Sequence, residues 1–318
     1  MSKILLNKNI EKIFVPNRKC IVNVDLDGIL SGMLLQHFLN WTVVGYSSCC
    51  GKPDDELWLE DKQEELKECV FVDLPVCVKD FSVIDQHFVA FNEDGINSYN
   101  ANLNKVNPNI IRKKVFKNKD NKCKYTQKYP FGTVHFILAI LENLEIIDEN
   151  YSIDLKKKID DFDLADLLLR ADRVIGNTFS YTPNCYDWAD WIMEIGKKNT
   201  KDLFVIVKNE FPKRKYIEGR VEAKLKSLGC IGGDGDCSNL FREKSYVSLI
   251  EYFSYLSECL EMKPLPMFKL FDFTKLKGKR FEVNTYNLDV LENESSKDNV
   301  FSFAFVTMRA LSLTYMED

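Results

Sequence analysis

The sequence predicts an α/β fold in two parts, a parallel-sheet domain over residues 1–196 and a smaller α/β domain over residues 202–318. Three short apolar runs in the first part, at residues 21–24, 69–72 and 81–84, have the length and the β-branched content of buried strands. An apolar helical pattern follows the first of these runs. Strands followed by helices are typical of a parallel sheet whose faces are covered by those helices.

The second part follows the polar segment Lys197-Lys-Asn-Thr-Lys201, which has the composition of a linker. Leu203-Phe-Val-Ile-Val207 then predicts the first strand of a new domain, because the run is short, apolar and β-branched. A helical pattern covers residues 245–261, and residues 299–309 alternate like a strand. These elements predict a second domain of α/β type.

Composition and charge limit the class of protein. The chain has 318 residues, of which 45% are hydrophobic and 29% charged, as in a globular protein. No apolar run reaches the roughly 18 residues of a membrane span, and the first residues become polar too quickly for a secretory signal. Ten cysteines without a Cys-x-x-Cys pair indicate neither a disulfide framework nor a zinc site, so we expect a cytoplasmic protein. The net charge of −5 argues against a protein that coats long nucleic acid.

Two carboxylates follow the first predicted strand. The run that ends at Val24 leads into Asp25-Leu-Asp27-Gly28, after which the helical pattern begins. Ligands of open α/β sheets bind at the carboxyl ends of the strands, and two carboxylates one residue apart can face the same hard cation. The alternative is an ordinary strand-to-helix turn that uses Asp and Gly for its conformation.

The other two predicted strands also end in aspartate. Asp73 follows the run at residues 69–72, and Asp85 follows the run at residues 81–84 with His87 two places on. Because parallel strands align their carboxyl ends, these side chains predict a shared acidic crevice. A cation would relieve the repulsion between the carboxylates.

This order of motifs resembles the DHH phosphoesterases, a family that includes RecJ-type exonucleases and hydrolases of nano-RNA and cyclic dinucleotides. The family has Asp-x-Asp-Gly, then a lone Asp after a strand, then Asp-His-His, and this chain has Asp25-Leu-Asp27-Gly28, Asp73 and Asp85-Gln86-His87. A later metal-binding Asp near the end of a helix is matched by Asp172, with Asp166 as the second choice. The resemblance covers about residues 19–175.

The resemblance implies a metal-dependent phosphodiesterase or exonuclease with a DHH-like first domain and a substrate-binding second domain. Its substrates would be short single-stranded nucleic acids, oligonucleotides or linear and cyclic dinucleotides, hydrolysed by metal-activated water. The implied catalytic residues are Asp25, Asp27, Asp73, Asp85, His87 and Asp172. One or two Mn²⁺ or Mg²⁺ ions would be held by Asp25, Asp27, Asp73, Gln86, His87 and Asp172. No membrane partner is expected, and a homodimer is left open.

The third motif departs from the family at Gln86, where the family has a metal-binding histidine. An amide oxygen binds Mg²⁺ or Mn²⁺ but is a weaker ligand than imidazole for softer metals. Either the metal preference has changed, or the chain is a catalytically impaired module that binds a nucleotide or a protein. The chain also has no Gly-Gly-x-His stretch near its end, where the family has a substrate loop.

Substrate contacts are expected mainly in a basic stretch. Residues 112–128 contain eight Lys or Arg and one Asp, with Phe116 and Tyr125 between them, which predicts contact with a phosphate backbone and a stacked base. A solvated loop is the alternative. The candidate substrate-binding residues are Ser31, Asn107, Lys113, Lys114, Lys117 and Arg309.

A second family stays open on the evidence of Gly232-Gly-Asp-Gly-Asp236. The haloacid-dehalogenase-like phosphatases also begin with Asp-x-Asp-Gly and end their site with a Gly-Asp segment after a catalytic Lys. On that hypothesis Asp25 is the nucleophile, Asp27 the general acid and Asp234 a Mg²⁺ ligand, with Lys224 or Lys226 as the lysine. It would leave Asp73 and Asp85 without a role, and a Gly-Asp turn explains residues 232–236 equally well.

Overall fold

The computed structural model describes residues 8–49, 53–61, 64–102, 104–116, 124–173, 182–210, 215–268, 272–283 and 288–316. The chain divides into two compact units, each built from segments that are separate in the sequence. The sheet unit contains Leu6–Asn23, Thr42–Tyr129 and Leu270–Asp318. The helical unit contains Val24–Trp41 and Pro130–Lys269. The boundary predicted between the two domains, near residues 196–202, falls inside the helical unit. The assignment of phosphoesterase and substrate-binding roles to the two sides of this boundary stays a prediction.

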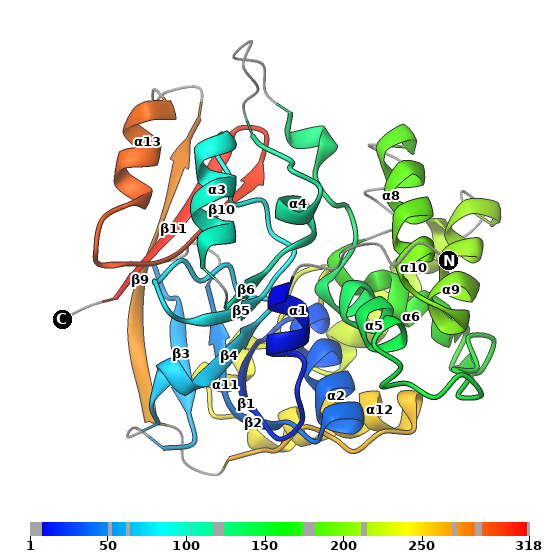
Figure 1. Cartoon of the computed structure of the whole chain (residues 1–318). Coiled ribbons are helices and arrows are strands. Elements are labelled where there is room, and N and C mark those ends of the chain that lie inside the picture. Colours follow the sequence, from blue (N-terminus) through cyan, green and yellow to red (C-terminus); the bar gives the residue numbers. More distant parts are fainter. Residues whose placement is uncertain are drawn as a thin grey trace. The chain divides into compact units, whose positions relative to one another are not determined.

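The sheet unit is organised around parallel strands in the order β2-β1-β4-β5-β6 (Figure 1). Their bounds are β1 Lys19–Asn23, β2 Thr42–Ser48, β4 Cys69–Val72, β5 Ser82–Ile84 and β6 Lys105–Val106. Cys20, Ile21 and Val22 are fully buried, as expected for a strand that is covered on both faces. The strands predicted at residues 21–24, 69–72 and 81–84 are therefore confirmed as β1, β4 and β5, within a few residues at their ends.

Antiparallel strands extend this sheet on the β2 side. Strand β3 (Glu56–Leu59) pairs with β2, and β9 (Asp272–Glu282) pairs with β3 through its first residues and with β11 (Ala310–Met316) through the rest. Strand β10 (Val300–Thr307) completes a sheet of nine strands in the described residues. The fold is thus α/β, with a mixed, mostly parallel sheet and a small antiparallel sheet from the C-terminal residues.

The C-terminal strands also pack against the parallel strands. Phe301 of β10 and Leu276 of β9 share a core with Ile21, Phe71 and Val83. The rings of Phe71 and Phe301 pack edge to face, with their centroids 5.6 Å apart. The backbone of β10 bridges to the segments that follow β4 and β5, at Val76↔Ser302 and Phe88↔Phe305. The sheet unit also contains helices α1 Lys8–Ile13, α3 Glu93–Ala101, α4 Pro108–Ile111 and α13 Leu288–Ser295, with 3-10 turns η1 Leu66–Glu68 and η2 Tyr125–Gln127.

The helical unit contains the middle of the chain. Its long helices are α2 Leu26–Leu39, α5 Thr133–Asn143, α8 Thr182–Ile195, α9 Lys198–Asn209, α10 Lys215–Ser227 and α12 Tyr246–Leu260. Shorter elements are strands β7 Lys158–Ile159 and β8 Phe162–Asp163, helices α6 Leu164–Arg170 and α11 Ser238–Arg242, and the 3-10 turn η3 Ala171–Arg173. None of the helices in the described ranges is both long enough and apolar enough to cross a membrane.

The strand predicted at residues 203–207 is wrong, because this segment belongs to helix α9. Leu203, Phe204 and Val207 are buried together with Asn199 and Thr200, and these positions recur at helical spacing along one face. Val205 between them is 46% exposed, which a buried strand would not allow. The β-branched content of the run therefore misled the prediction, whereas the wider pattern is that of an amphipathic helix.

Candidate metal centre

The carboxyl ends of neighbouring parallel strands supply the side chains of the candidate site. Asn23 ends β1, Asp73 follows β4, Asp85 follows β5 and Asn107 follows β6. From β1 the chain continues to β2 on one side, whereas β4, β5 and β6 follow one another on the other side. Strands β1 and β4 therefore flank the point where the strand order reverses, which is where open α/β sheets bind their ligands.

Asp73, Asp85 and His87 form the candidate metal-binding group. Each offers one ligand atom, and these atoms all lie within 4.8 Å of one another. Both carboxylates are about 1% exposed, whereas the His87 side chain is 26% exposed. Two buried carboxylates this close repel each other unless a positive charge lies between them. The strand ends predicted an acidic crevice that these residues share with Asp25 and Asp27, and the structure groups Asp73, Asp85 and His87.

The Asp85 carboxylate fixes the position of His87. Its Oδ1 accepts a hydrogen bond from His87 Nδ1 at 2.6 Å, and its Oδ2 accepts from the His87 backbone N–H at 3.0 Å. Asn107 Nδ2 donates to the same Oδ2 at 3.3 Å and to the His87 carbonyl at 2.8 Å. A carboxylate can only accept, so Nδ1 carries the proton and the lone pair of the neutral ring is on Nε2. This is the arrangement in which a carboxylate orients a metal-binding histidine.

Asp73 has an unusual backbone conformation. Its φ is 58°, in the left-handed region that costs an L-residue about 1–2 kcal/mol. Its backbone N–H donates to the Ile84 carbonyl at 2.8 Å, and Asn23 Nδ2 donates to its Oδ2 at 3.1 Å. Contacts from both neighbouring strands thus hold Asp73 in this conformation, as is common for residues at functional sites.

Gln86 presents a buried amide oxygen that has no hydrogen-bond partner in the described part of the chain. The residue is 1% exposed, and its Oε1 accepts no hydrogen bond, although its carbonyl accepts one from Asn109 Nδ2 at 2.7 Å. Burying an unsatisfied oxygen costs about 1–3 kcal/mol. A bound cation would satisfy this oxygen, but Gln86 as a ligand of the same ion as Asp73 and His87 stays a prediction. Carboxylates and an imidazole form a donor set that binds Mn²⁺ or Mg²⁺.

Asn23 and Asn109 were not predicted as site residues. Asn109 is fully buried; its amide holds the Gln86 carbonyl, and its Oδ1 accepts from the Tyr129 N–H at 2.6 Å. The Asn-Pro-Asn segment that contains Asn107 and Asn109 was visible in the sequence. Asn23, the polar residue at the end of β1, was visible in the sequence too. Nothing in the sequence indicated which groups the side chains of Asn23 and Asn109 would contact.

Asp27 has a different environment, in the helical unit. Its Oδ2 accepts from the Thr133 N–H at 2.7 Å and its Oδ1 from the Val134 N–H at 2.8 Å, so both oxygens bind the first amides of α5. An anion at this position is stabilised by the unpaired amides and by the helix dipole. Asp27 therefore anchors the start of α5, and its role as a metal ligand stays a prediction.

Asp25 caps helix α2 and lies among other acids. Its Oδ1 accepts from the Gly28 N–H at 2.9 Å. Burial, with the nearby carboxylates of Asp27, Asp234 and Asp236, raises the pKa of Asp25 well above its usual range. This acidic cluster belongs entirely to the helical unit.

The other predicted ligand, Asp172, lies in the 3-10 turn η3 of the helical unit, with a φ of 49°. Its alternative, Asp166, accepts from the Asp163 N–H at 2.9 Å and so takes part in capping α6. The structure brings together Asp73, Asp85 and His87. Participation of Asp25, Asp27 and Asp172 in the same centre stays a prediction.

The predicted substrate contacts have different surroundings. Ser31 is fully buried in α2, and Asn107 holds Asp85 and His87. Lys113 is exposed, Lys114 is half-buried, and Arg309 is exposed in the turn between β10 and β11. Lys117 lies outside the described residues. Contact of any of these residues with a substrate stays a prediction.

Comparisons of the chain with protein-family models, with curated proteins and with solved structures found no match.

Proposed function

We propose that this chain is a divalent-metal-dependent phosphodiesterase that hydrolyses short nucleic acids, oligonucleotides or dinucleotides. The observation that carries the proposal is the Asp73, Asp85 and His87 group at the carboxyl ends of β4 and β5, next to the point between β1 and β4 where the strand order reverses. The resemblance of the Asp25-x-Asp27, Asp73 and Asp85-Gln-His87 motifs to the DHH phosphoesterases supports the same chemistry.

Within this proposal each residue of the centre has its own task. Asp73 and His87 Nε2 hold the ion, and Gln86 Oε1 supplies a neutral oxygen. Asp85 holds the His87 ring in the required tautomer, and Asn107 holds Asp85. A bound Mn²⁺ or Mg²⁺ would supply Lewis-acid activation of a water molecule and of the phosphoryl oxygens.

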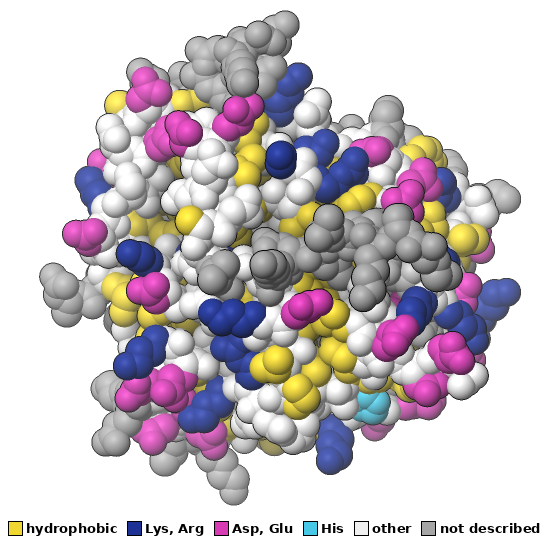
Figure 2. Space-filling model, viewed as in Figure 1, with side chains coloured by type: hydrophobic (Ala, Val, Ile, Leu, Met, Phe, Trp, Pro, Cys, Tyr) yellow, Lys and Arg dark blue, Asp and Glu magenta, His cyan; other side chains and the backbone are white. Residues whose placement is uncertain are grey.

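The charge of the chain supports a short substrate. The net charge is −5, and on the face shown in Figure 2 the Lys and Arg side chains are interspersed with Asp and Glu. A protein that tracks along a polynucleotide needs many cationic phosphate contacts, whereas a dinucleotide or a strand end needs few. Exposed Lys113 and half-buried Lys114 are the candidate phosphate contacts.

The test is hydrolysis with Mn²⁺ or Mg²⁺ of a panel of single-stranded DNA, short oligoribonucleotides and linear and cyclic dinucleotides. We expect Asp85→Asn to lower the rate by roughly 10–100-fold, as for the loss of a group that orients a metal ligand. Asp80→Asn is the control, because Asp80 is an exposed aspartate in the connection that leads into β5, five residues before Asp85. No hydrolysis of any member by the wild-type protein, or equal rates for both variants, would refute the proposal.

A phosphatase of the haloacid-dehalogenase type is the second candidate, and one observation favours it. The Leu26 N–H donates to the Asp234 carbonyl at 3.0 Å, and the Asp234 carboxylate is close enough to Asp25 to raise its pKa. The lysines that this mechanism needs are otherwise engaged: Lys224 pairs with Asp160 at 3.1 Å and Lys226 with Glu222 at 2.7 Å.

Two measurements distinguish the candidates. The phosphodiesterase proposal predicts that Asp234→Asn keeps activity within a few-fold and that no covalent intermediate forms. A phosphoaspartate at Asp25, or its mimic with beryllium fluoride, together with loss of activity in Asp234→Asn, would support the second candidate instead.

A further inference from the structure

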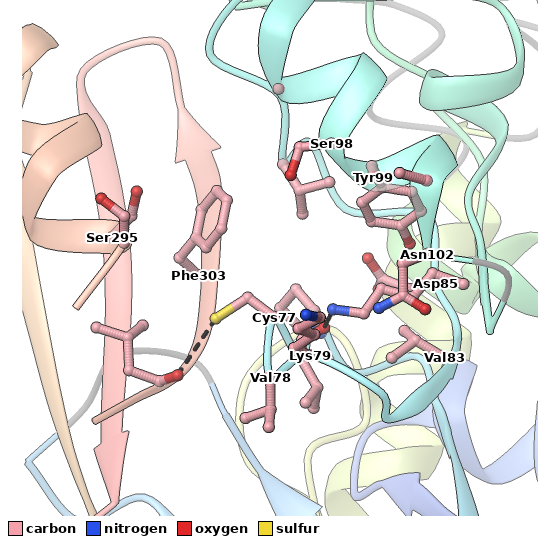
Figure 3. Close-up of a pocket in the computed structure, with 18 of the residues that line it drawn as sticks. Cys77, Val78, Lys79, Val83, Asp85, Ser98, Tyr99, Asn102, Ser295 and Phe303 are labelled. Atoms are coloured by element: carbon pink, nitrogen blue, oxygen red, sulfur yellow. Dashed lines mark hydrogen bonds between the residues drawn. The ribbon is translucent and has the colours of Figure 1, made fainter. Parts of the chain in front are cut away.

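A pocket of about 1030 Å³ lies within the sheet unit, beside the candidate metal centre (Figure 3). It is bounded by helix α3, by residues 75–80 and by residues of α13 and β10. Pockets that hold small molecules usually measure about 300–1,000 Å³. The pocket is therefore large enough for a ligand of nucleotide size or larger.

The walls of the pocket are partly aromatic. Phe91, Tyr99 and Phe303 line it together with several valines. Figure 3 shows Phe303 on β10 and Tyr99 on α3 at two sides of the open space, with Ser98 of α3 directed toward it. Aromatic faces from separate elements can enclose a flat apolar body, and such surfaces are typical of ligand pockets.

The pocket also contains a buried ammonium group. Lys105 is 5% exposed, and its Nζ donates to the Val76 carbonyl at 3.2 Å and lies 5.9 Å from the centre of the Tyr99 ring. In the described residues that carbonyl is its one hydrogen-bond acceptor, and no carboxylate forms an ion pair with it. Buried charges in proteins are normally paired, because an unpaired one loses its hydration without compensation.

Burial also lowers the pKa of Lys105 to about 8, against the smaller opposing influences of Cys77 and Asp80. Burial thus weakens the protonated form of Lys105 without removing it. An anionic ligand beside the Lys105 ammonium would raise its pKa again and stabilise the charged form. The other buried charge that lines the pocket, Asp85, already accepts hydrogen bonds on both oxygens from His87 and Asn107.

We propose that this pocket binds a small organic anion with an aromatic body, whose acidic group pairs with Lys105 and whose ring lies against Tyr99 and Phe303. The acidic group is a carboxylate or a phosphate monoester, since either accepts hydrogen bonds from an ammonium. Binding does not require an ion in the metal centre, so the proposal stands apart from the phosphodiesterase activity.

The experiment measures binding of benzoate and phenyl phosphate by calorimetry, with EDTA present so that neither probe binds through a metal. Benzyl alcohol and inorganic phosphate are the comparison probes, lacking the charge and the ring respectively. We expect benzyl alcohol to bind at least about tenfold more weakly than benzoate, as for the loss of a hydrogen bond to a charged group. Inorganic phosphate should likewise bind at least about tenfold more weakly than phenyl phosphate, because it lacks the ring that lies against Tyr99 and Phe303.

Two variants test the location. Lys105→Met should weaken benzoate and phenyl phosphate by roughly 10–100-fold, whereas Lys79→Met, at an exposed lysine of the same pocket, should change neither. Ser98→Phe adds a bulky ring to the pocket from an exposed position of α3 and leaves Lys105 unchanged. It should block both probes even if Lys105→Met does not fold. Unchanged binding in Ser98→Phe, or benzyl alcohol binding as tightly as benzoate, would overturn the proposal.

Discussion

Gln86 is the residue at which the candidate metal centre differs from the family it resembles. Its buried Oε1 has no hydrogen-bond partner in the described residues, and an amide oxygen is a weaker ligand than imidazole for softer metals. We predict that Gln86→His strengthens Mn²⁺ binding by about tenfold, the lower end of the effects known for altered metal shells. Calorimetry with Mn²⁺ checks this, and Gln127→His, at an exposed position of the same unit, is the control. Weaker binding in Gln86→His would mean that the amide is an adapted ligand.

His135 is expected to make stability depend on pH. The Gly132 N–H donates to its Nδ1 at 2.9 Å, its Nε2 contacts the Leu168 carbonyl at 3.0 Å, and burial lowers its pKa to about 4. In the unfolded chain a histidine has a pKa of about 6.5. The His135 ring therefore binds a proton more readily in the unfolded chain than in the folded protein. The contribution of His135 is complete above pH 6.5 and is lost as the pH falls toward 4, by up to about 3 kcal/mol.

Comparing the wild-type protein with histidine variants separates the contribution of His135 to the pH dependence of stability from that of the acidic groups. Urea unfolding at pH 7 and at pH 4.5 should show a smaller loss of stability for His135→Gln than for the wild-type protein. His37→Gln, at an exposed histidine of α2, should keep the full wild-type loss. An equal pH dependence in His135→Gln and wild type would contradict the assignment.

At the level of elements, the start of α5 depends on the close approach of Gly132 to Asp27. A Cβ atom at Gly132 would lie 2.6–2.8 Å from the Asp27 carboxylate, which the amides of Thr133 and Val134 hold in place. We predict that Gly132→Ala lowers the free energy of unfolding by roughly 1–3 kcal/mol, as for an overpacked site. Chemical denaturation measures this.

Gly219 provides the matched control. It lies in α10 without a positive φ, and a Cβ atom added there would have no neighbour within 4 Å. Gly219→Ala should therefore stabilise the protein by about 0.4–1 kcal/mol. If both substitutions stabilise the protein, the contact between Gly132 and Asp27 does not constrain the helix.

The elements that could be predicted from the sequence are those whose pattern is local. Strands β1, β4 and β5 are continuous apolar runs, and the aspartates at their ends follow directly. This is why Asp73, Asp85 and His87 were predicted in one crevice, together with Asp25 and Asp27, whose place there stays a prediction. Helix α9 was missed because its β-branched run resembles a strand when it is read without its flanks. Strand β3 was missed because it lies in a polar, charged segment and is recruited by pairing with β2 and β9. The role of Asp27 depends on α5, about a hundred residues away, and no local pattern contains it.

At the level of the whole molecule, both units are discontinuous in sequence. The sheet unit takes β9, β10 and β11 from the last fifty residues, and the helical unit takes α9 to α12 from residues 198–260. We predict that a fragment of residues 1–196 does not unfold cooperatively, because it lacks the strands that cover the core around Phe71 and the helices that pack on α5 and α6. Near-ultraviolet circular dichroism and urea unfolding would show this, and a sharp transition would support a sequential division of the chain.

The central claim is that Asp73 and His87 bind a divalent cation while Asp85 orients the histidine. Pulsed electron paramagnetic resonance of the Mn²⁺-loaded chain tests it most directly, because a coordinating imidazole gives a nitrogen coupling and the chain has three histidines. The account predicts a nitrogen coupling that disappears in His87→Gln, persists in His37→Gln, and is lost together with Mn²⁺ binding in Asp73→Asn but not in Asp80→Asn. Absence of Mn²⁺ binding by the wild-type chain, or a nitrogen coupling that survives in His87→Gln, would contradict it.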